Sequence, residues 1–327
     1  MPVTRTVAWW NLENLFDEEN SPLRTEKVKR TLGDSIKGWT PVLRDLKIKQ
    51  LASVIAQMNG GAGPDLLGVC EVENRHVLEL LVAQLAPLLP NRLYAIVHAD
   101  TDDARGIDVA FLYDPRQFEV PEGEVFFHVV MRRNATREIV QVNFRTRPGG
   151  RTWAVFGNHW PSRSGGQAES AGYRDIAGET LAYFHQRALE VHGTATPTLA
   201  MGDFNDEPFD ASLVIHALST RQRQRVLLAD TPRLWNLMWP VMGIADGSFY
   251  FDNQPNMLDQ FLVNKYMVVE QAAVRAEPAT VRILRLPEAV APGPYPKPRP
   301  FGGMGDPVDP KGFSDHFPIV MQVTEAD

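Results

Sequence analysis

Residues able to take part in chemistry stand at the ends of a series of short apolar runs in this chain. The runs are rich in β-branched and aromatic residues, which is typical of buried strands. The polar residue after each run is Asn11 after residues 6–10, Glu71 after 65–69, His159 after 152–156 and Asp203 after 196–201. Since strand ends converge on one rim of a sheet, we expect one site at that rim.

Helical patterns alternate with these runs. Apolar residues recur at helical spacing over residues 46–58, 76–89 and 167–192. Further strands are expected at 94–98, 107–113, 124–130, 138–144, 257–263, 268–274 and 316–323, with a hairpin turn at 146–151. The pattern predicts an α/β fold with two stacked mixed β-sheets and helices on the outside.

The chain is predicted to form one catalytic domain over residues 1–327. Its length alone would favour two domains, but it has no internal repeat and no low-complexity linker. Residues 17–41 and 286–313 are expected to be insertions on the rim. The second is rich in Pro and Gly and leads into Ser314-Asp315-His316, so we expect it to face the substrate. The alternative is a mobile surface loop.

The charge balance is acidic. There are 33 Lys and Arg against 40 Asp and Glu, a formal net charge of −7, which argues against the broad basic surface of tight non-specific DNA binders. Local basic clusters that could still touch nucleic acid are Arg24, Lys27, Lys29 and Arg30, then Arg132 and Arg133, then Arg221, Arg223 and Arg225.

The cysteine content points to a reducing compartment. Cys70 is the single cysteine, so no intramolecular disulfide can form, and its apolar neighbours predict a small core residue. A cytoplasmic location is expected because no signal-peptide pattern is present, although a secreted form with its leader removed stays open. No run reaches transmembrane length, so no membrane insertion is expected. No protein partner is predicted.

The residues at the rim provide oxygen ligands for a hard cation. Mg²⁺ prefers carboxylate oxygens, keeps several waters and binds substrate phosphate oxygens. We expect Glu71 to be the principal metal ligand, with Asn11 beside it as a neutral ligand or a positioning amide. Asp315 is expected to join the metal or water network.

Asp203 and Asn205 lie two residues apart, so in an extended chain they face the same side. One carboxylate could hold the attacking water while one amide donates to a phosphate oxygen. The alternative is an ordinary Asp/Asn turn. Gly202 before them is expected to allow a tight turn after the strand.

Two histidines complete the predicted chemistry. His316 needs a carboxylate partner, and Asp259, between apolar neighbours in a strand, fits better than the adjacent Asp315. His159 could protonate the leaving oxygen from the other side. Arg163 could clamp a phosphate in bidentate fashion, and Arg299 in the long loop could contact substrate.

Taken together, six motifs resemble those of the endonuclease/exonuclease/phosphatase superfamily, in the same order. They are Trp10-Asn11-Leu12, Cys70-Glu71-Val72, Asn158 to Arg163, Gly202 to Asn205, Leu258-Asp259-Gln260 and Ser314-Asp315-His316. The resemblance implies a four-layer α/β sandwich of the deoxyribonuclease I type, a Mg²⁺ or Mn²⁺ requirement and the residue roles given above.

His159 matches the second histidine of the deoxyribonuclease and sphingomyelinase branches, whereas apurinic endonucleases have another residue there. In the deoxyribonuclease branch this histidine pairs with a Glu on an early strand. Here the nearby strand offers Asp108, whose side of the sheet depends on a register of one residue.

These observations predict a divalent-metal-dependent phosphodiester hydrolase. The first hypothesis is a nuclease, endonuclease or exonuclease, acting on nucleic acid. The alternative is a phosphodiesterase or phosphatase acting on a small or lipid-derived phosphoester. A non-catalytic binding module would have lost at least one central residue, and all of them are present.

Overall fold

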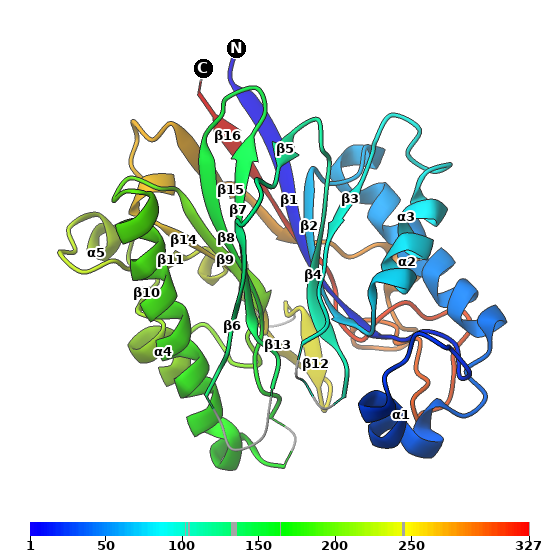
Figure 1. The fold of residues 1–327 in the computed structure, drawn as a ribbon. Coiled ribbons are helices and arrows are strands. Elements are labelled where there is room, and N and C mark those ends of the chain that lie inside the picture. Colours follow the sequence, from blue (N-terminus) through cyan, green and yellow to red (C-terminus); the bar gives the residue numbers. More distant parts are fainter. Residues whose placement is uncertain (102, 104, 132–135, 164, 244–245, 327) are drawn as a thin grey trace.

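Two stacked mixed β-sheets lie between outer helices, as the computed structural model shows (Figure 1). The structure describes residues 1–101, 103, 105–131, 136–163, 165–243 and 246–326. The amino- and carboxyl-terminal ends lie side by side, because the first and last strands pair in antiparallel fashion, with Val3 opposite Glu325. The predicted fold class, a four-layer α/β sandwich of the deoxyribonuclease I type, is confirmed.

The first sheet joins strands from the two halves of the chain. Its order is β15 (Val274–Ile283), β16 (Ile319–Glu325), β1 (Val3–Leu15), β2 (Leu66–Val72), β4 (Asp108–Tyr113) and β3 (Ala95–Val97). Only the β1–β2 pair is parallel among the pairings of this sheet in the described residues.

The second sheet holds most of the middle of the chain. Its order is β10 (Ser219–Thr220), β11 (Leu234–Asn236), β14 (Asp259–Asn264), β9 (Thr198–Asp203), β8 (Thr152–His159), β7 (Ile139–Thr146) and β5 (Phe118–Glu119), and β6 (Val125–His128) also pairs with β7. A separate ribbon of β12 (Phe249–Phe251) and β13 (Gln254–Asn256) lies below the centre of the molecule in Figure 1.

Helices cover the outer faces of both sheets (Figure 1). The α-helices are α1 (Glu26–Leu32), α2 (Pro41–Gly61), α3 (Arg75–Leu85), α4 (Gln167–His192) and α5 (Arg223–Leu227). Short 3₁₀ or π turns are η1 (Gly33–Ile36), η2 (Ser212–His216), η3 (Trp239–Val241), η4 (Lys265–Met267) and η5 (Pro287–Ala289). Among the described residues, the helices are all too short or too polar to span a membrane.

Strand alternation divides the core into layers. In β1, Val7 and Trp9 pack between the sheets, whereas Ala8, Trp10 and Leu12 pack toward α2 and α3. A strand sends successive side chains to opposite faces, so a continuous apolar run fills both layers. A third apolar layer lies between the second sheet and α4.

The two predicted rim insertions pack against each other. Val28, Leu32, Ile36 and Trp39 from residues 17–41 form a small apolar cluster with Phe301 of the 286–313 loop. The rings of Trp39 and Phe301 meet edge to face, with centroids 5.8 Å apart. The loop is therefore tied to the body of the protein, in contrast to the alternative of a mobile excursion.

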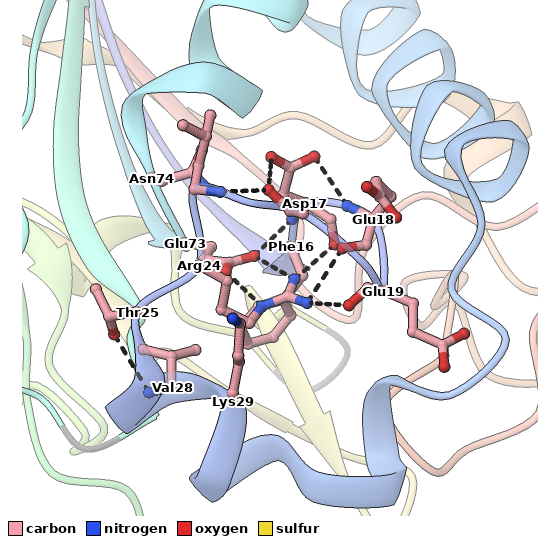
Figure 2. A network of polar contacts seen from close by, with 12 residues as sticks. Phe16, Asp17, Glu18, Glu19, Arg24, Thr25, Val28, Lys29, Glu73 and Asn74 are labelled. Atoms are coloured by element: carbon pink, nitrogen blue, oxygen red, sulfur yellow. Dashed lines mark hydrogen bonds and ion pairs between the residues drawn. The ribbon is translucent and has the colours of Figure 1, made fainter.

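The first insertion is fixed by a buried ion pair (Figure 2). Arg24 Nε and Nη2 donate to the Glu73 carboxylate at 2.6 and 2.7 Å, and its guanidinium also donates to the carbonyls of Asp17, Glu18 and Glu19. Removing one partner of such a pair costs about 3–5 kcal/mol. Arg24 is thus a structural residue, whose buried guanidinium is fully engaged with Glu73 and these carbonyls.

One predicted strand is wrong. Residues 268–274 were expected to be extended, but η4 ends at Met267, a turn follows it, and β15 begins only at Val274. The amide groups of Val268 and Val269 both donate to the Lys265 carbonyl, so these two residues close the helical turn of η4. Short apolar runs do not separate these two outcomes.

Candidate active site

The site lies where β1 and β2 break their pairing. The register of the parallel pair shifts between Asn11 and Leu15, and Glu13, Asn14 and Glu71 all have positive φ, at 52°, 58° and 63°. Side chains other than Gly rarely adopt this conformation, and such strain concentrates at functional sites. Asn11 faces the second sheet because it continues the alternation of Val7 and Trp9, whereas the irregular backbone at Glu71 turns that side chain to the same side.

Strand β9 places three of the predicted residues side by side. His159 is paired with Asp203 across the parallel β8–β9 ladder, and Asp259 is paired with Asp203 across the antiparallel β14–β9 ladder. A Cβ on Gly202 would lie 2.3 Å from the Asn158 carbonyl oxygen. Gly202 is therefore needed for close strand packing, and the expectation of a tight turn at this glycine is wrong.

An amide bridges the carboxylates of the two sheets. Asn11 Nδ2 donates to Asp203 Oδ2 at 3.1 Å and to Glu71 Oε1 at 3.4 Å, while Asn11 Oδ1 accepts from the Glu13 amide at 2.9 Å. The Glu13 amide fixes which end of the side chain is oxygen. Asn11 thus links the two carboxylates through its amide nitrogen, while its oxygen already accepts a hydrogen bond.

His316 is held by Asp259 as predicted. Its Nδ1 donates to Asp259 Oδ2 at 2.7 Å, and Trp9 Nε1 donates to the other oxygen at 3.0 Å. Burial opposes a charge on this imidazole, but the carboxylates of Asp259, Asp315 and Asp203 outweigh burial and hold the pKa of His316 well above its ordinary value. His316 Nε2 then faces Asp203 Oδ2 at 3.9 Å as a charged donor.

His159 also faces Asp203 and lies near Glu71. Its Nε2 lies 3.6 Å from Glu71 Oε1 and 3.8 Å from Asp203 Oδ2. Burial, together with the positive charges of Arg137 and Arg105, holds the pKa of His159 well below its ordinary value. Its buried Nδ1 has no hydrogen-bond partner among the described residues.

The structure does not pair Asp108 with His159. Val109 and Phe111 of β4 point between the sheets, so Asp108 belongs to the opposite face of the strand. There its Oδ1 accepts from the amide and the hydroxyl of Thr101 at 3.1 and 2.6 Å, and its Oδ2 lies 3.3 Å from His98 Nε2. A shift of one residue along β4 would have put Asp108 on the face that looks toward the second sheet.

Asn205 and Arg163 lie at the open side of the site. Asn205, with a φ of 52°, donates its side-chain amide to the Trp160 carbonyl at 3.0 Å and its backbone amide to Asp203 Oδ1 at 2.9 Å. The side-chain NH₂ carries a second hydrogen besides the one donated to Trp160. Arg163 Nε donates to the Asn205 carbonyl at 2.8 Å and its Nη2 donates to Asp210 at 3.1 Å.

A groove of about 550 Å³ opens beside Asn205. Arg163, Phe249, Phe251 and Leu258 are among its lining residues. Phe249 also packs on the ring of His316, with centroids 4.8 Å apart, so the groove adjoins His316 directly. Arg299 forms a two-pronged ion pair with Asp309 at 2.7 and 3.2 Å, and its contact with substrate stays a prediction.

Three charged residues at the site were missed from the sequence. Arg137 is buried, donates to the Trp160 carbonyl at 2.7 Å and acts on the pKa of His159. Lys47 is fully buried and donates to the Glu13 carbonyl, and Glu13 accepts from the amides of Phe301 and Gly302 at 2.7 and 2.9 Å. The burial of Lys47 could have been predicted from the sequence, because it stands in the apolar stripe of α2 with Leu51.

The carboxylates here fit a divalent cation. Burial raises the pKa of Asp203 to about 6. Partial burial and the charges of Glu71 and Asp203 raise that of Asp315 to about 6, against the opposing charges of His316 and Lys47. Crowded carboxylates of this kind gain most from a cation, and oxygen donors with room for water are those that Mg²⁺ uses. Glu71 and Asp315 are the residues that would hold it.

Two stacked sheets with acids, amides and imidazoles gathered on one rim define a class of phosphoester hydrolases. Residues 6–325 match the model of the endonuclease/exonuclease/phosphatase family, and the chain belongs to this family. Phosphoester hydrolysis is the activity that this membership supports. Among curated proteins, none matches the sequence.

Solved structures of similar fold cover the whole chain at low sequence identity. An endonuclease/exonuclease/phosphatase family protein from Bacteroides thetaiotaomicron is 16% identical, with a TM-score of 0.56 and 100% of both chains covered. A mannosyl-6-phosphatase from the same organism is 16% identical, with a TM-score of 0.55 and 98% and 99% of the two chains covered. The human Nocturnin catalytic domain is 15% identical, with a TM-score of 0.54 and 99% and 95% covered.

Proposed function

We propose that this protein is a divalent-metal-dependent phosphoester hydrolase whose substrate is a compact phosphoester with an apolar or planar group beside the phosphate. The observation that carries the proposal is the groove of about 550 Å³ that adjoins His316 and Asn205. Its size lies in the range of small-ligand pockets, and apolar walls with few polar groups are typical of them.

Each residue at the rim has its own role in hydrolysis. Asp203, with a pKa raised to about 6, accepts the proton of the attacking water. His316, charged through Asp259, donates from Nε2 to a phosphoryl oxygen or to the leaving oxygen. Asn205 donates its free amide hydrogen to another phosphoryl oxygen.

We assign His159 a role other than the predicted protonation of the leaving oxygen. Its lowered pKa leaves a neutral imidazole at neutral pH, so it is better suited to orient water or substrate than to act as the acid. Mg²⁺ or Mn²⁺, held by Glu71 and Asp315, would neutralise phosphate charge and polarise the phosphorus–oxygen bond.

Nuclease activity is the second candidate. It is favoured by the presence of two imidazoles that both lie within 4 Å of Asp203. Of the basic clusters that could bind a polynucleotide, Arg24 is committed to Glu73 and Arg223 donates to the Val268 carbonyl. Arg132 and Arg133 lie outside the described residues. The net charge of −7 also favours a compact substrate.

One assay set separates the two candidates. Plasmid DNA, RNA, bis-p-nitrophenyl phosphate and a panel of sugar, nucleotide and lipid-headgroup phosphoesters are compared at equal enzyme concentration. We expect turnover of small phosphoesters and none of the polymers, loss of all activity with EDTA, and recovery with Mg²⁺ or Mn²⁺. Cleavage of plasmid DNA as the faster reaction would overturn the compact-substrate proposal in favour of a nuclease, and full activity in chelator would overturn the metal requirement.

The groove is tested by a matched pair of variants. Phe251 is 72% exposed at the groove, and Phe126 is 39% exposed on a strand of the second sheet. We expect Phe251→Ala to raise KM for the preferred small substrate by roughly 10-fold with little change in kcat, since an apolar contact is worth 1–3 kcal/mol. Phe126→Ala is the control and should leave both constants unchanged. An unchanged KM in Phe251→Ala would remove the groove from substrate binding.

A further inference from the structure

A second cluster of metal-binding side chains lies on the far face of β4. His98, Asp100 and Asp108 each offer one ligand atom, and these atoms lie within 4.8 Å of one another. His98 and Asp100 follow β3, and Asp108 begins β4, so the three residues stand at the two ends of the loop 98–108. They share no residue with the set at the catalytic rim.

The imidazole of His98 lacks a hydrogen bond where one would be expected. Its side chain is only 2% exposed, and its buried Nε2 has no hydrogen-bond partner among the described residues. This nitrogen lies 3.3 Å from Asp108 Oδ2, close enough for an ion pair. A buried imidazole nitrogen that lies beside a carboxylate oxygen without a hydrogen bond between them leaves room for a shared cation, which would satisfy both atoms.

The spacing fits a small transition-metal ion. Zinc sits about 2.0–2.2 Å from nitrogen and oxygen donors, and a tetrahedral arrangement then separates neighbouring donors by roughly 3.3 Å. That is the separation of His98 Nε2 and Asp108 Oδ2. Asp100 is exposed, so its carboxylate can swing the remaining distance at little cost.

Hydrogen bonds from Thr101 orient Asp108 for binding a metal ion. Its Oδ1 is held by the amide and hydroxyl of Thr101, which leaves Oδ2 for a ligand bond. Asp100 and Asp108 also line a cavity of about 40 Å³, large enough for a water molecule. The buried Asn74 Nδ2 has no partner in the described part of the chain and lines the same cavity, where it could donate to that water.

We propose that His98, Asp100 and Asp108 form a second metal site that takes Zn²⁺ and closes the loop 98–108. A histidine ligand disfavours Mg²⁺, which selects oxygen donors, so the two sites are chemically distinct. The closed loop carries Asp103, whose Oδ2 lies 3.5 Å from Arg137 Nη1. Zinc would therefore stabilise the position of Asp103, which in turn holds Arg137 beside the catalytic rim.

The test measures zinc retained per chain after dialysis in excess Mg²⁺. We expect one zinc in the wild-type protein and in the control Glu122→Gln, which changes an exposed carboxylate in another turn. His98→Gln and Asp100→Asn should each lose it. Glu71→Gln, at the catalytic rim, should keep zinc while losing hydrolysis, so failure here and failure of the hydrolase proposal give different results.

Melting temperatures show whether a variant that loses zinc is still folded. Asp100→Asn changes only an exposed side chain, so its zinc-free melting temperature should equal that of the wild type. Saturating Zn²⁺ should raise the wild-type melting temperature by about 3 °C or more and leave Asp100→Asn unmoved. Absence of zinc from the wild type, or zinc that survives both His98→Gln and Asp100→Asn, would overturn the proposal.

Discussion

The two imidazoles of the catalytic rim sit in opposite electrostatic surroundings. His316 has carboxylates around it, and Asp259 holds its Nδ1 at 2.7 Å, which raises its pKa. His159 has Arg137 and Arg105 nearby and a buried Nδ1 without a partner among the described residues, which lowers its pKa. Both face Asp203, at 3.9 and 3.8 Å. A pair of like residues is thus separated into a charged donor and a neutral one by their neighbours alone.

Removing His316 should have the largest effect. We expect His316→Gln to lower kcat by about 10³-fold, because the variant loses the charged donor next to the phosphoryl group. The measurement is steady-state turnover of the preferred small phosphoester with saturating Mg²⁺. A loss of only a few-fold, with an unchanged circular dichroism spectrum, would refute the role of His316.

Changing the partner of His316 should have an intermediate effect. Asp259→Asn keeps the size of the side chain but donates to Nδ1, which leaves a neutral His316, so kcat should fall roughly 10²-fold. Asp259 acts through His316, and for that reason Asp259→Asn in the His316→Gln background should add almost nothing. Two losses that multiply would contradict this coupling.

Removing His159 should have the smallest effect of the three. We expect His159→Gln to lower kcat by about 10-fold, because a neutral hydrogen-bonding group is exchanged for another. The same turnover assay gives the value, and the melting temperature reports on packing at this buried position. If His159→Gln proved as damaging as His316→Gln, the two histidines would have equivalent roles and the contrast between them would fail.

The sequence allowed much of the fold to be predicted from local patterns. The bounds of α4 are those expected, and the strand runs that end at Glu71, His159 and Asp203 are present as β2, β8 and β9. Long periodic stretches specify their own structure. Residues 268–274 did not, because a short apolar run suits a strand and a capped turn equally well. The single-domain organisation stays a prediction.

The candidate site was less predictable where it depends on long-range contacts. The pairing of Asp259 with His316 followed from the cost of burying a lone carboxylate. The face of Asp108 depended on one residue of register, and Arg137 carried no local sign of its burial. Lys47 could have been found, since a lysine in an apolar helix stripe must have a partner. The roles of these residues stay predictions until the variants are measured.

The contact between the two rim segments has an evolutionary consequence. Phe301 is enclosed by the first segment, and Glu13, two residues beyond Asn11, caps the backbone of Phe301 and Gly302. Exchanging either segment with that of a relative would break the apolar contact, whereas exchanging both together would preserve it. The two segments should therefore diversify as one module, and changes of specificity within such a lineage should arrive as linked replacements on both.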